Sequence, residues 1–339
     1  MSLPPIAALA DIPALADTLP VEDRAAADAA RARQNSLTKP PGSLGRLEQL
    51  AEFMAAWRGT ARPEIWRAQA LVFAGNHGIC AQGVNPYPQE VTAQMVANFE
   101  RGGAAINQLC AVNGADLTVI ALELGRPTAD FTEGPAMSET DCLDAFWQGA
   151  SAVDDGADVL ILGEMGIGNS TVAAALASAC FGGPVAEWVG PGTGSDKAGI
   201  NRKVDAIERG LKRHDAILGN PMAVLAALGG REQAAICGAV LAARAARIPV
   251  ILDGFICTAA AAVLYAADKR LLDHCLVGHV SAEPGHRKLL AAIHKRPVLE
   301  FDMRLGEGSG AALALGILRA ALACHNGMAT FGEAGVSGA

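Results

Sequence analysis

Aromatic side chains and positive charge are both scarce in this sequence. Phe, Trp and Tyr make up only 4% of the 339 residues, although hydrophobic residues together make up 51%. The interior must therefore be built mainly from Ala, Leu, Val and Ile. The formal net charge is −8, which argues against a nucleic-acid partner because such proteins carry a basic patch or stripe. This charge balance still allows one pocket for an anionic small molecule.

Signals for secretion, membrane insertion and metal binding are also missing. The N-terminal stretch carries Asp11 and Asp17 and has no basic region, so it does not read as a signal peptide. No apolar run reaches the roughly 18 uninterrupted residues expected of a membrane span. The eight cysteines form no CxxC pair and the seven histidines no HxxxH or HExxH pair, so we expect buried free thiols, no metal site and no cofactor. The expected location is the cytoplasm, without a membrane partner.

The pattern of apolar residues predicts an α/β fold. Residues 1–60 read as helical, with a helix over 23–34 and a second one that Ser43 could cap. Short apolar runs then alternate with helical segments, and these runs are expected to form strands: ALVFAG (70–75), LTVIAL (117–122), DVLILG (158–163), IPVILDG (248–254) and CLVGHV (275–280). Strands that are apolar on both faces indicate a parallel, Rossmann-like sheet flanked by helices. Ligands bind beyond the carboxyl ends of the strands in such sheets.

Three glycine-rich loops follow or lie near these carboxyl ends. They are GEMGIGNST (163–171), GPGTGSDKAGINRK (190–203) and GHVSAEPGHRK (278–288). None has the GxGxxG or P-loop spacing, so a dinucleotide is weakly supported and a P-loop is excluded. Asn169, Ser170 and Thr171 could simply cap a helix, and Lys203 could be a solvated surface charge. Taken together, however, the loops favour a ligand that carries phosphate.

Two carboxylates lie inside glycine-rich loops, Glu164 in GEMG and Glu307 in GEGSG. A favourable charge at a helix N-terminus would explain Glu307 structurally, and would contribute about 0.3–1 kcal/mol. Ser309 would suit that position equally well without flanking glycines. The alternative is a general base that a flat substrate can approach closely, which typically contributes about 10²–10⁴-fold to a rate.

Seven motifs in the same order resemble those of the nicotinate-nucleotide–dimethylbenzimidazole phosphoribosyltransferase family, which acts in cobalamin nucleotide-loop assembly. They are KPPGSLGRLE (39–48), AGNHG (74–78), YPQEVTAQMV (87–96), GEMGIGNST (163–171), ILDGF (251–255), SAEPGH (281–286) and RLGEGSGAALA (304–314). One departure is Asn76, which stands where some relatives carry Asp. His77 beside it is expected to be structural.

The resemblance implies a reaction and a set of site residues. Ribose 5-phosphate would pass from nicotinate mononucleotide to 5,6-dimethylbenzimidazole with inversion at C1′, giving α-ribazole 5′-phosphate and nicotinate. Glu307 would be the catalytic base and Glu164 the second active-site carboxylate, with no metal. The expected substrate-binding residues are Tyr87, Gln94, Met165, Gly166, Gly192, Gly194, Lys203, Ser281, Arg304 and Gly306. Of these, Tyr87, Gln94 and Met165 are expected near the azole.

The resemblance also implies an architecture. A large α/β domain would span residues 66–304, and a small helical domain would combine residues 1–65 and 305–339. The family forms homodimers, so we expect one here.

Two other classes of function stay open at this stage. One is a nucleoside phosphorylase or a metal-dependent transferase that uses phosphoribosyl pyrophosphate. Asp154 and Asp155 do not fit the acidic pair of such a transferase, because they precede their strand rather than follow it. The other is a nucleotide-binding sensor without catalysis, against which the intact Glu307 loop argues.

Overall fold

A six-stranded parallel sheet forms the centre of the computed structural model, which describes residues 3–337. The strand order is β2-β1-β3-β4-β5-β6, and every neighbouring pair is parallel. The strands are β1 (Ala68–Ala74), β2 (Ala115–Ala121), β3 (Val159–Met165), β4 (Val250–Leu252), β5 (Cys275–Val280) and β6 (Pro297–Glu300). The predicted parallel α/β sheet is confirmed. The sixth strand was not expected, because PVLE is short and only partly buried.

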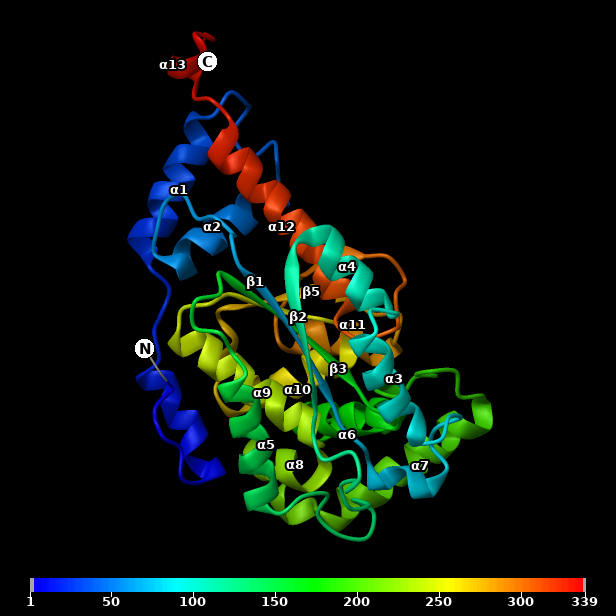
Figure 1. Cartoon of the computed structure of the whole chain (residues 1–339). Helices are drawn as coiled ribbons and strands as arrows, with labels where there is room; N and C mark the ends of the chain where they lie inside the picture. The colour runs from blue at the N-terminus through cyan, green and yellow to red at the C-terminus, as the bar shows by residue number, and fades with distance from the viewer. Residues whose placement is uncertain (1–2, 338–339) are drawn as a thin grey trace.

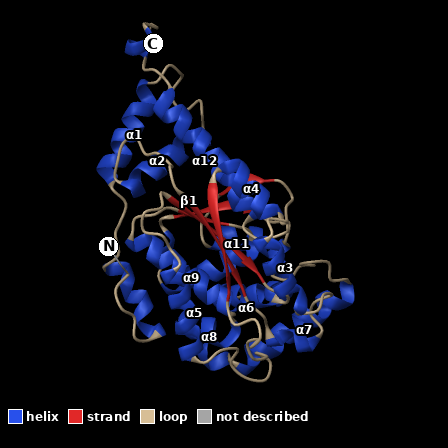
Figure 2. Cartoon of the chain, in the orientation of Figure 1, coloured by secondary structure: helices blue, strands red, loops and turns tan. Residues whose placement is uncertain are grey.

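Helices cover both faces of this sheet (Figures 1 and 2). The α-helices are α1 (Arg24–Ser36), α2 (Arg46–Arg58), α3 (Glu90–Glu100), α4 (Ala105–Asn113), α5 (Glu139–Ser151), α6 (Asn169–Phe181), α7 (Lys197–Arg213), α8 (Pro221–Leu228), α9 (Arg231–Ala245), α10 (Phe255–Ala267), α11 (Pro284–Ala292), α12 (Ser309–Gly327) and α13 (Phe331–Ala334). The 3₁₀ helices are η1 (Leu9–Asp17), η2 (Gly78–Gln82), η3 (Val185–Glu187), η4 (Asp215–Ile217) and η5 (Lys269–Leu272). Among the described helices, none is long and apolar enough to cross a membrane.

Alternate residues of each central strand enter different cores. Leu71 and Phe73 of β1 point into a core with helices α5, α6, α8, α9 and α10. Ala70 and Val72 point the other way, into a core with α2, α4 and α12. Because both faces are covered, the central strands read as continuous apolar runs in the sequence. The small side chains of the Ala-rich helices let them pack closely on the sheet and on one another.

Helices α1 and α2 from the N-terminal part of the chain lie beside α12 from the C-terminal part (Figure 1). Helix α2 packs on both α1 and α12, and Figure 1 shows these helices together at one end of the molecule, with α13 beyond them. The Arg33 guanidinium donates from Nε to the carbonyl of His325 at 2.8 Å, and Leu37 forms a β-bridge with Thr330. The other end of α12 lies on the sheet, so this one helix connects the terminal helices to the strand ends.

The expected cap of α2 is wrong. This helix begins at Arg46 and its N-cap is Gly45, at φ 54°, rather than Ser43. The Glu48 side chain instead accepts a hydrogen bond from the Leu44 amide and forms a buried ion pair with Lys39 at 2.7 Å. The carboxylate in the first turn therefore accepts from an amide just before the helix, and no side chain caps the helix at its N-cap position.

Candidate active site

The loops at the carboxyl ends of β3, β4 and β5 surround a cavity. Eight of the predicted site residues line it: Glu164, Met165, Gly166, Gly192, Lys203, Ser281, Arg304 and Gly306. They come from segments far apart in the sequence, and the parallel sheet brings them together because its strands all end at the same edge.

Four predicted residues lie outside this lining. Glu307 is buried and follows Gly306 in the chain, and Gly306 lines the cavity. Tyr87 is 50% exposed, although its neighbours Asn85 and Pro86 line the cavity. Gln94 is exposed on α3, and Gly194 is exposed in the loop before α7. The assignments of Tyr87, Gln94 and Gly194 to substrate binding stay predictions.

Glu164, near the carboxyl end of β3, supplies the first buried carboxylate. Its side chain is 4% exposed and accepts a hydrogen bond from the side-chain amide of Asn169, at the start of α6. Burial raises its pKa well above the usual range, and the charges of Asp253, Glu232 and Glu307 raise it further. A Cβ on Gly306 would stand 2.7 Å from Glu164 Oε1. Glycine at 306 therefore lets the loop approach this carboxylate.

Glu307 stands in a strained turn just before α12, and this turn packs against the end of β3. It adopts a left-handed conformation, with φ 63°, between Gly306 at φ 85° and Gly308 at φ 84°. A left-handed residue with a side chain costs about 1–2 kcal/mol, so other contacts must hold it. One is the hydrogen bond from the Glu307 amide to the carbonyl of Glu164, at 3.2 Å. The two carboxylate residues are thus joined through the backbone.

The carboxyl group of Glu307 is poised to titrate near neutrality. It is 5% exposed, and its Oε2 is buried without a hydrogen-bond partner among residues 3–337. Burial raises its pKa to about 7, with a further contribution from the charge of Asp253. A general base works best when its pKa lies near the working pH. The raised pKa therefore suits proton removal, and the neighbouring residue Gly306 lines the cavity.

Another part of the cavity lining is suited to an anion. Helix α6 begins at Asn169, and its N-cap is Gly168 rather than one of the polar residues Asn169, Ser170 and Thr171. Lys203 is 2% exposed, and its Nζ donates to Ser170 Oγ and to the Gly190 carbonyl, both at 3.1 Å. A buried ammonium beside a helix N-terminus is a favourable setting for phosphate. The alternative of a solvated Lys203 is wrong.

Three residues that the sequence did not single out complete the cavity surroundings. Glu283 accepts a hydrogen bond from the Gly192 amide at 2.8 Å and is 6% exposed. His279 lines the cavity beside Asp253, whose carboxylate raises the pKa of both Glu164 and Glu307. Asp253 directly follows β4, His279 lies near the end of β5, and Glu283 lies in the loop after β5. This position at the strand ends was their signal in the sequence.

His77 lies beneath the cavity and not in its lining. It is fully buried, and its Nε2 lies 2.7 Å from Glu232 Oε1 at the start of α9. The neighbouring Asn76 donates its amide to the Leu124 carbonyl. These contacts join the end of β1 to α9 and to the loop after β2.

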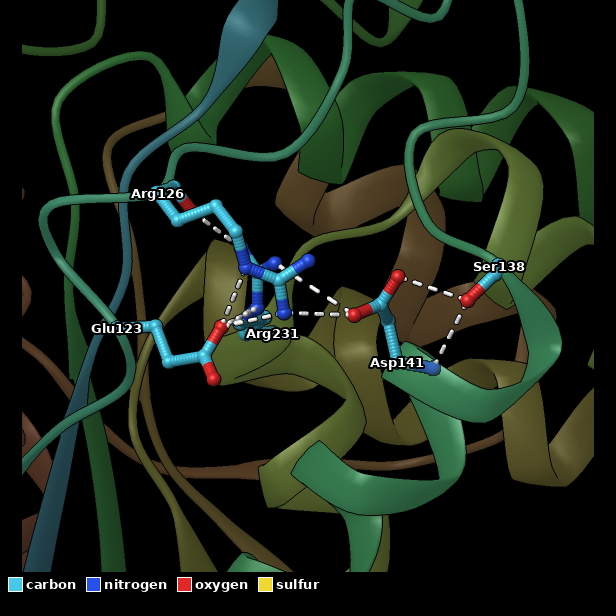
Figure 3. Close-up of polar contacts among 5 residues, drawn as sticks. All are labelled: Glu123, Arg126, Ser138, Asp141 and Arg231. Carbon is cyan, nitrogen blue, oxygen red and sulfur yellow. Dashed lines mark hydrogen bonds and ion pairs between the residues drawn. The ribbon is translucent and has the colours of Figure 1, made fainter.

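A group of charged side chains fixes the start of α9, next to Glu232 (Figure 3). Arg231 Nη1 donates to the Arg126 carbonyl at 2.7 Å, and Arg231 Nε lies 3.5 Å from Glu123 Oε2. Arg126 also pairs with Asp141 at 2.7 Å, and Asp141 is bonded to Ser138, the N-cap of α5. These contacts hold the loop after β2, α5 and α9 in one arrangement.

The described residues include no group of three His, Cys, Asp or Glu side chains placed to hold a metal ion. Their cysteines are all free thiols; five are buried as expected, whereas Cys80, Cys180 and Cys324 are only partly buried.

Comparisons with known proteins agree with the architecture. A family model described as Phosphoribosyltransferase matches residues 19–336. A nicotinate-nucleotide–dimethylbenzimidazole phosphoribosyltransferase from Rhodobacter capsulatus is 67% identical, over 97% of this chain and 98% of that protein. One from Novosphingobium aromaticivorans is 58% identical, over 98% of each chain.

A solved structure shares the fold as well. The crystal structure of CobT from Thermus thermophilus superposes with a TM-score of 0.88 at 43% identity, covering 93% of this chain and 100% of that one. The chain therefore belongs to the nicotinate-nucleotide–dimethylbenzimidazole phosphoribosyltransferase family.

Proposed function

We propose that this protein transfers ribose 5-phosphate from nicotinate mononucleotide to 5,6-dimethylbenzimidazole in cobalamin lower-ligand assembly. The products are α-ribazole 5′-phosphate and nicotinate. The observation that carries the proposal is Glu307, a buried carboxyl with a pKa near 7 beside a cavity that also offers Lys203. The substrate names come from the relatives, and the chemistry of the cavity suits them.

Glu307 acts as the general base in this mechanism. One ring nitrogen of the benzimidazole bears a proton, and the carboxylate removes it. The lone pair of the opposite nitrogen then attacks C1′ of the ribose, on the face away from the departing pyridine ring. The β linkage becomes α, and the electron pair of the broken C–N bond goes to the nicotinate nitrogen. That nitrogen leaves as a neutral ring, so the step needs neither an acid nor a metal ion to assist the leaving group.

The anion side of the cavity holds the phosphate. Lys203 provides a charge-assisted hydrogen bond, and the start of α6 provides backbone amides and the Ser170 hydroxyl. Arg304 donates from Nη1 to the Gly192 carbonyl at 3.0 Å, which fixes the loop over this side. Phosphate binding here orients the ribose toward the two carboxyl groups.

Glu164 has one of two roles, which differ in the charge that they require. An ionised Glu164 would stabilise positive charge that develops on the ribose. A protonated Glu164 would instead hydrogen-bond the azole. The raised pKa of the free protein favours the protonated form, but the cationic pyridinium of a bound nucleotide would favour ionisation.

Two features of the whole protein belong to the proposal. The first is a division into a large domain, residues 66–304, and a small helical domain, residues 1–65 with 305–339. The second is a homodimer, which sedimentation would detect as a particle of twice the 34.7 kDa chain mass.

A metal-free assay tests the reaction. The protein is mixed with both substrates in the presence of EDTA, and nicotinate release and riboside formation are followed by chromatography. Glu307→Gln is run in parallel, and we expect it to lose at least about 10²-fold in rate. Equal rates would remove Glu307 from its role. Absence of product despite nucleotide binding would overturn the transferase for this substrate pair.

A further inference from the structure

The carboxylate of Asp253 lies beneath the turn that carries Glu307. Asp253 follows β4 and its side chain is fully buried. Its Oδ2 accepts a hydrogen bond from the Gly308 amide, and its Oδ1 accepts one from the Ala311 amide, both at 3.0 Å. Gly308 occupies the N-cap position of α12 and has no side chain to cap the helix. Asp253, which directly follows β4, supplies the acceptor that an N-cap side chain would otherwise provide.

One of these hydrogen bonds is made by the peptide that joins Glu307 to Gly308. Glu307 is held in its left-handed conformation from one side by the Glu164 carbonyl, which accepts from its amide. Asp253 holds the other side, because its bond to Gly308 fixes the next peptide. The fit is close, since a Cβ on Gly163 would stand 2.4 Å from the Gly308 amide nitrogen. Small shifts of this turn would therefore move the Glu307 carboxyl group.

Asp253 also places a second negative charge at the site. The basic side chain next to Asp253 is His279 of β5, whose Nε2 lies 3.5 Å from Asp253 Oδ1. Among the described residues, the other titratable groups around this end of α12 include Glu164 of β3, Arg304 in the preceding loop and Cys257 of α10. The charge of Glu232 of α9 also raises the pKa of Glu164. The α4 residue nearest Gly308, Ile106, is apolar.

We propose that Asp253 is a positioning residue of the transferase, which holds the turn that carries Glu307 through hydrogen bonds to the Gly308 and Ala311 amides and places a negative charge near the Glu307 carboxyl group. The inference rests on the proposed function, in which Glu307 removes the azole proton. Two consequences follow. Loss of the hydrogen bonds lowers the rate at every pH, and loss of the charge makes Glu307 a weaker base with a lower pKa.

Asp253→Asn removes the charge and one of the two acceptors. The Glu307 carboxyl is titrated by NMR in protein labelled with ¹³C at glutamate side chains, and the Glu307→Gln variant identifies its signal. We expect a midpoint near 7 in the original protein and one lower by about one pH unit in the Asn variant. The acid limb of kcat/KM shifts in the same direction. Its plateau falls by about tenfold or more, because a hydrogen bond to a charged group is lost.

Asp302→Asn is the matched control. This exposed residue lies five positions before Glu307 at φ 52°, a conformation that Asn tolerates. The charge change is the same, but water and salt screen it. We expect neither the Glu307 titration nor the acid limb to move.

Asp253→Glu separates position from charge and covers the case in which the Asn variant does not fold. It keeps the charge but displaces the oxygens by one methylene, so the plateau should fall about tenfold or more while the Glu307 midpoint stays near 7. An unchanged plateau in this variant would overturn the positioning role. An unchanged midpoint in Asp253→Asn would overturn the electrostatic part.

The titration does not require catalysis, so it separates the two proposals. Absence of riboside from the original protein would remove the transferase but leave the Asp253 measurement valid. Normal turnover by the original protein, together with an Asp253→Asn variant of unchanged profile and plateau, would remove Asp253 alone.

Discussion

Glu307 shows how burial gives an ordinary carboxyl group the properties of a neutral-pH base. Removal from water raises its pKa to about 7, and the Asp253 charge adds to the effect. Because the base must be deprotonated, kcat/KM is expected to rise with pH and to level off above about 7. Below that pH it should fall tenfold for each unit. Initial rates from pH 5 to 9 measure this profile, and an acid limb centred near 4.5 would contradict it.

Lys203 makes the corresponding prediction for phosphate binding. Its ammonium group is buried beside Ser170 and the Gly190 carbonyl, so a methionine would preserve much of its volume but remove a charged donor. We expect Lys203→Met to raise KM for the nucleotide about 10–100-fold, the value of a hydrogen bond to a charged group, with little change in KM for the azole. Lys212→Met is the control, since Lys212 is exposed on the same helix. Equal effects on both substrates would contradict a phosphate contact.

At the scale of elements, the placement of α12 against the sheet depends on glycines in the strands. A Cβ at Gly163 of β3 would lie 2.6 Å from the Glu307 carbonyl carbon. Gly163→Ala should therefore push the turn away and lower kcat at least about tenfold, while overpacking costs about 1–3 kcal/mol of stability. Gly219→Ala is the control, because a Cβ there meets nothing within 4 Å. Kinetics and urea unfolding of both variants measure the difference, and equal kcat values would refute this account.

The sequence predicted those elements whose environment is uniform along the chain. Strands β1, β3 and β5 are buried on both faces, so they appear as continuous apolar runs. Strand β6 was missed because it is partly exposed and starts with proline. The caps of α2 and α6 were missed because glycine occupies the N-cap of each.

The candidate site likewise contains residues that the sequence predicted and residues that it did not. Glycine loops and carboxylates identified Glu164, Glu307 and Lys203, because local spacing carries that information. The role of Asp253 was not predictable from spacing, since its partner amide at Gly308 lies 55 residues away in the chain. Only the arrangement of β4 beside β3 and beneath α12 brings the two together.

At the scale of the whole molecule, the buried carboxyl groups should make folding depend on pH. Burial is the main cause that raises the pKa of Glu164, Glu283 and Glu307. The folded state therefore holds protons that the unfolded chain releases near 4.5. Stability from these groups is fully present below about pH 4.5, and the Glu307 contribution is lost as the pH rises through 7.

Glu307→Gln isolates this contribution, because glutamine keeps the size of the side chain and cannot ionise. From pH 5 to 8, the original protein should lose roughly 2–3 kcal/mol of unfolding free energy relative to the variant, given a shift from 4.5 to about 7. Urea unfolding of both proteins at the two pH values measures this difference. Glu208→Gln, which removes an exposed carboxyl from α7, should follow the original protein at both values. If Glu307→Gln also followed it, the carboxyl of Glu307 would titrate alike in the folded and unfolded chains, and burial would not be the source of its basicity.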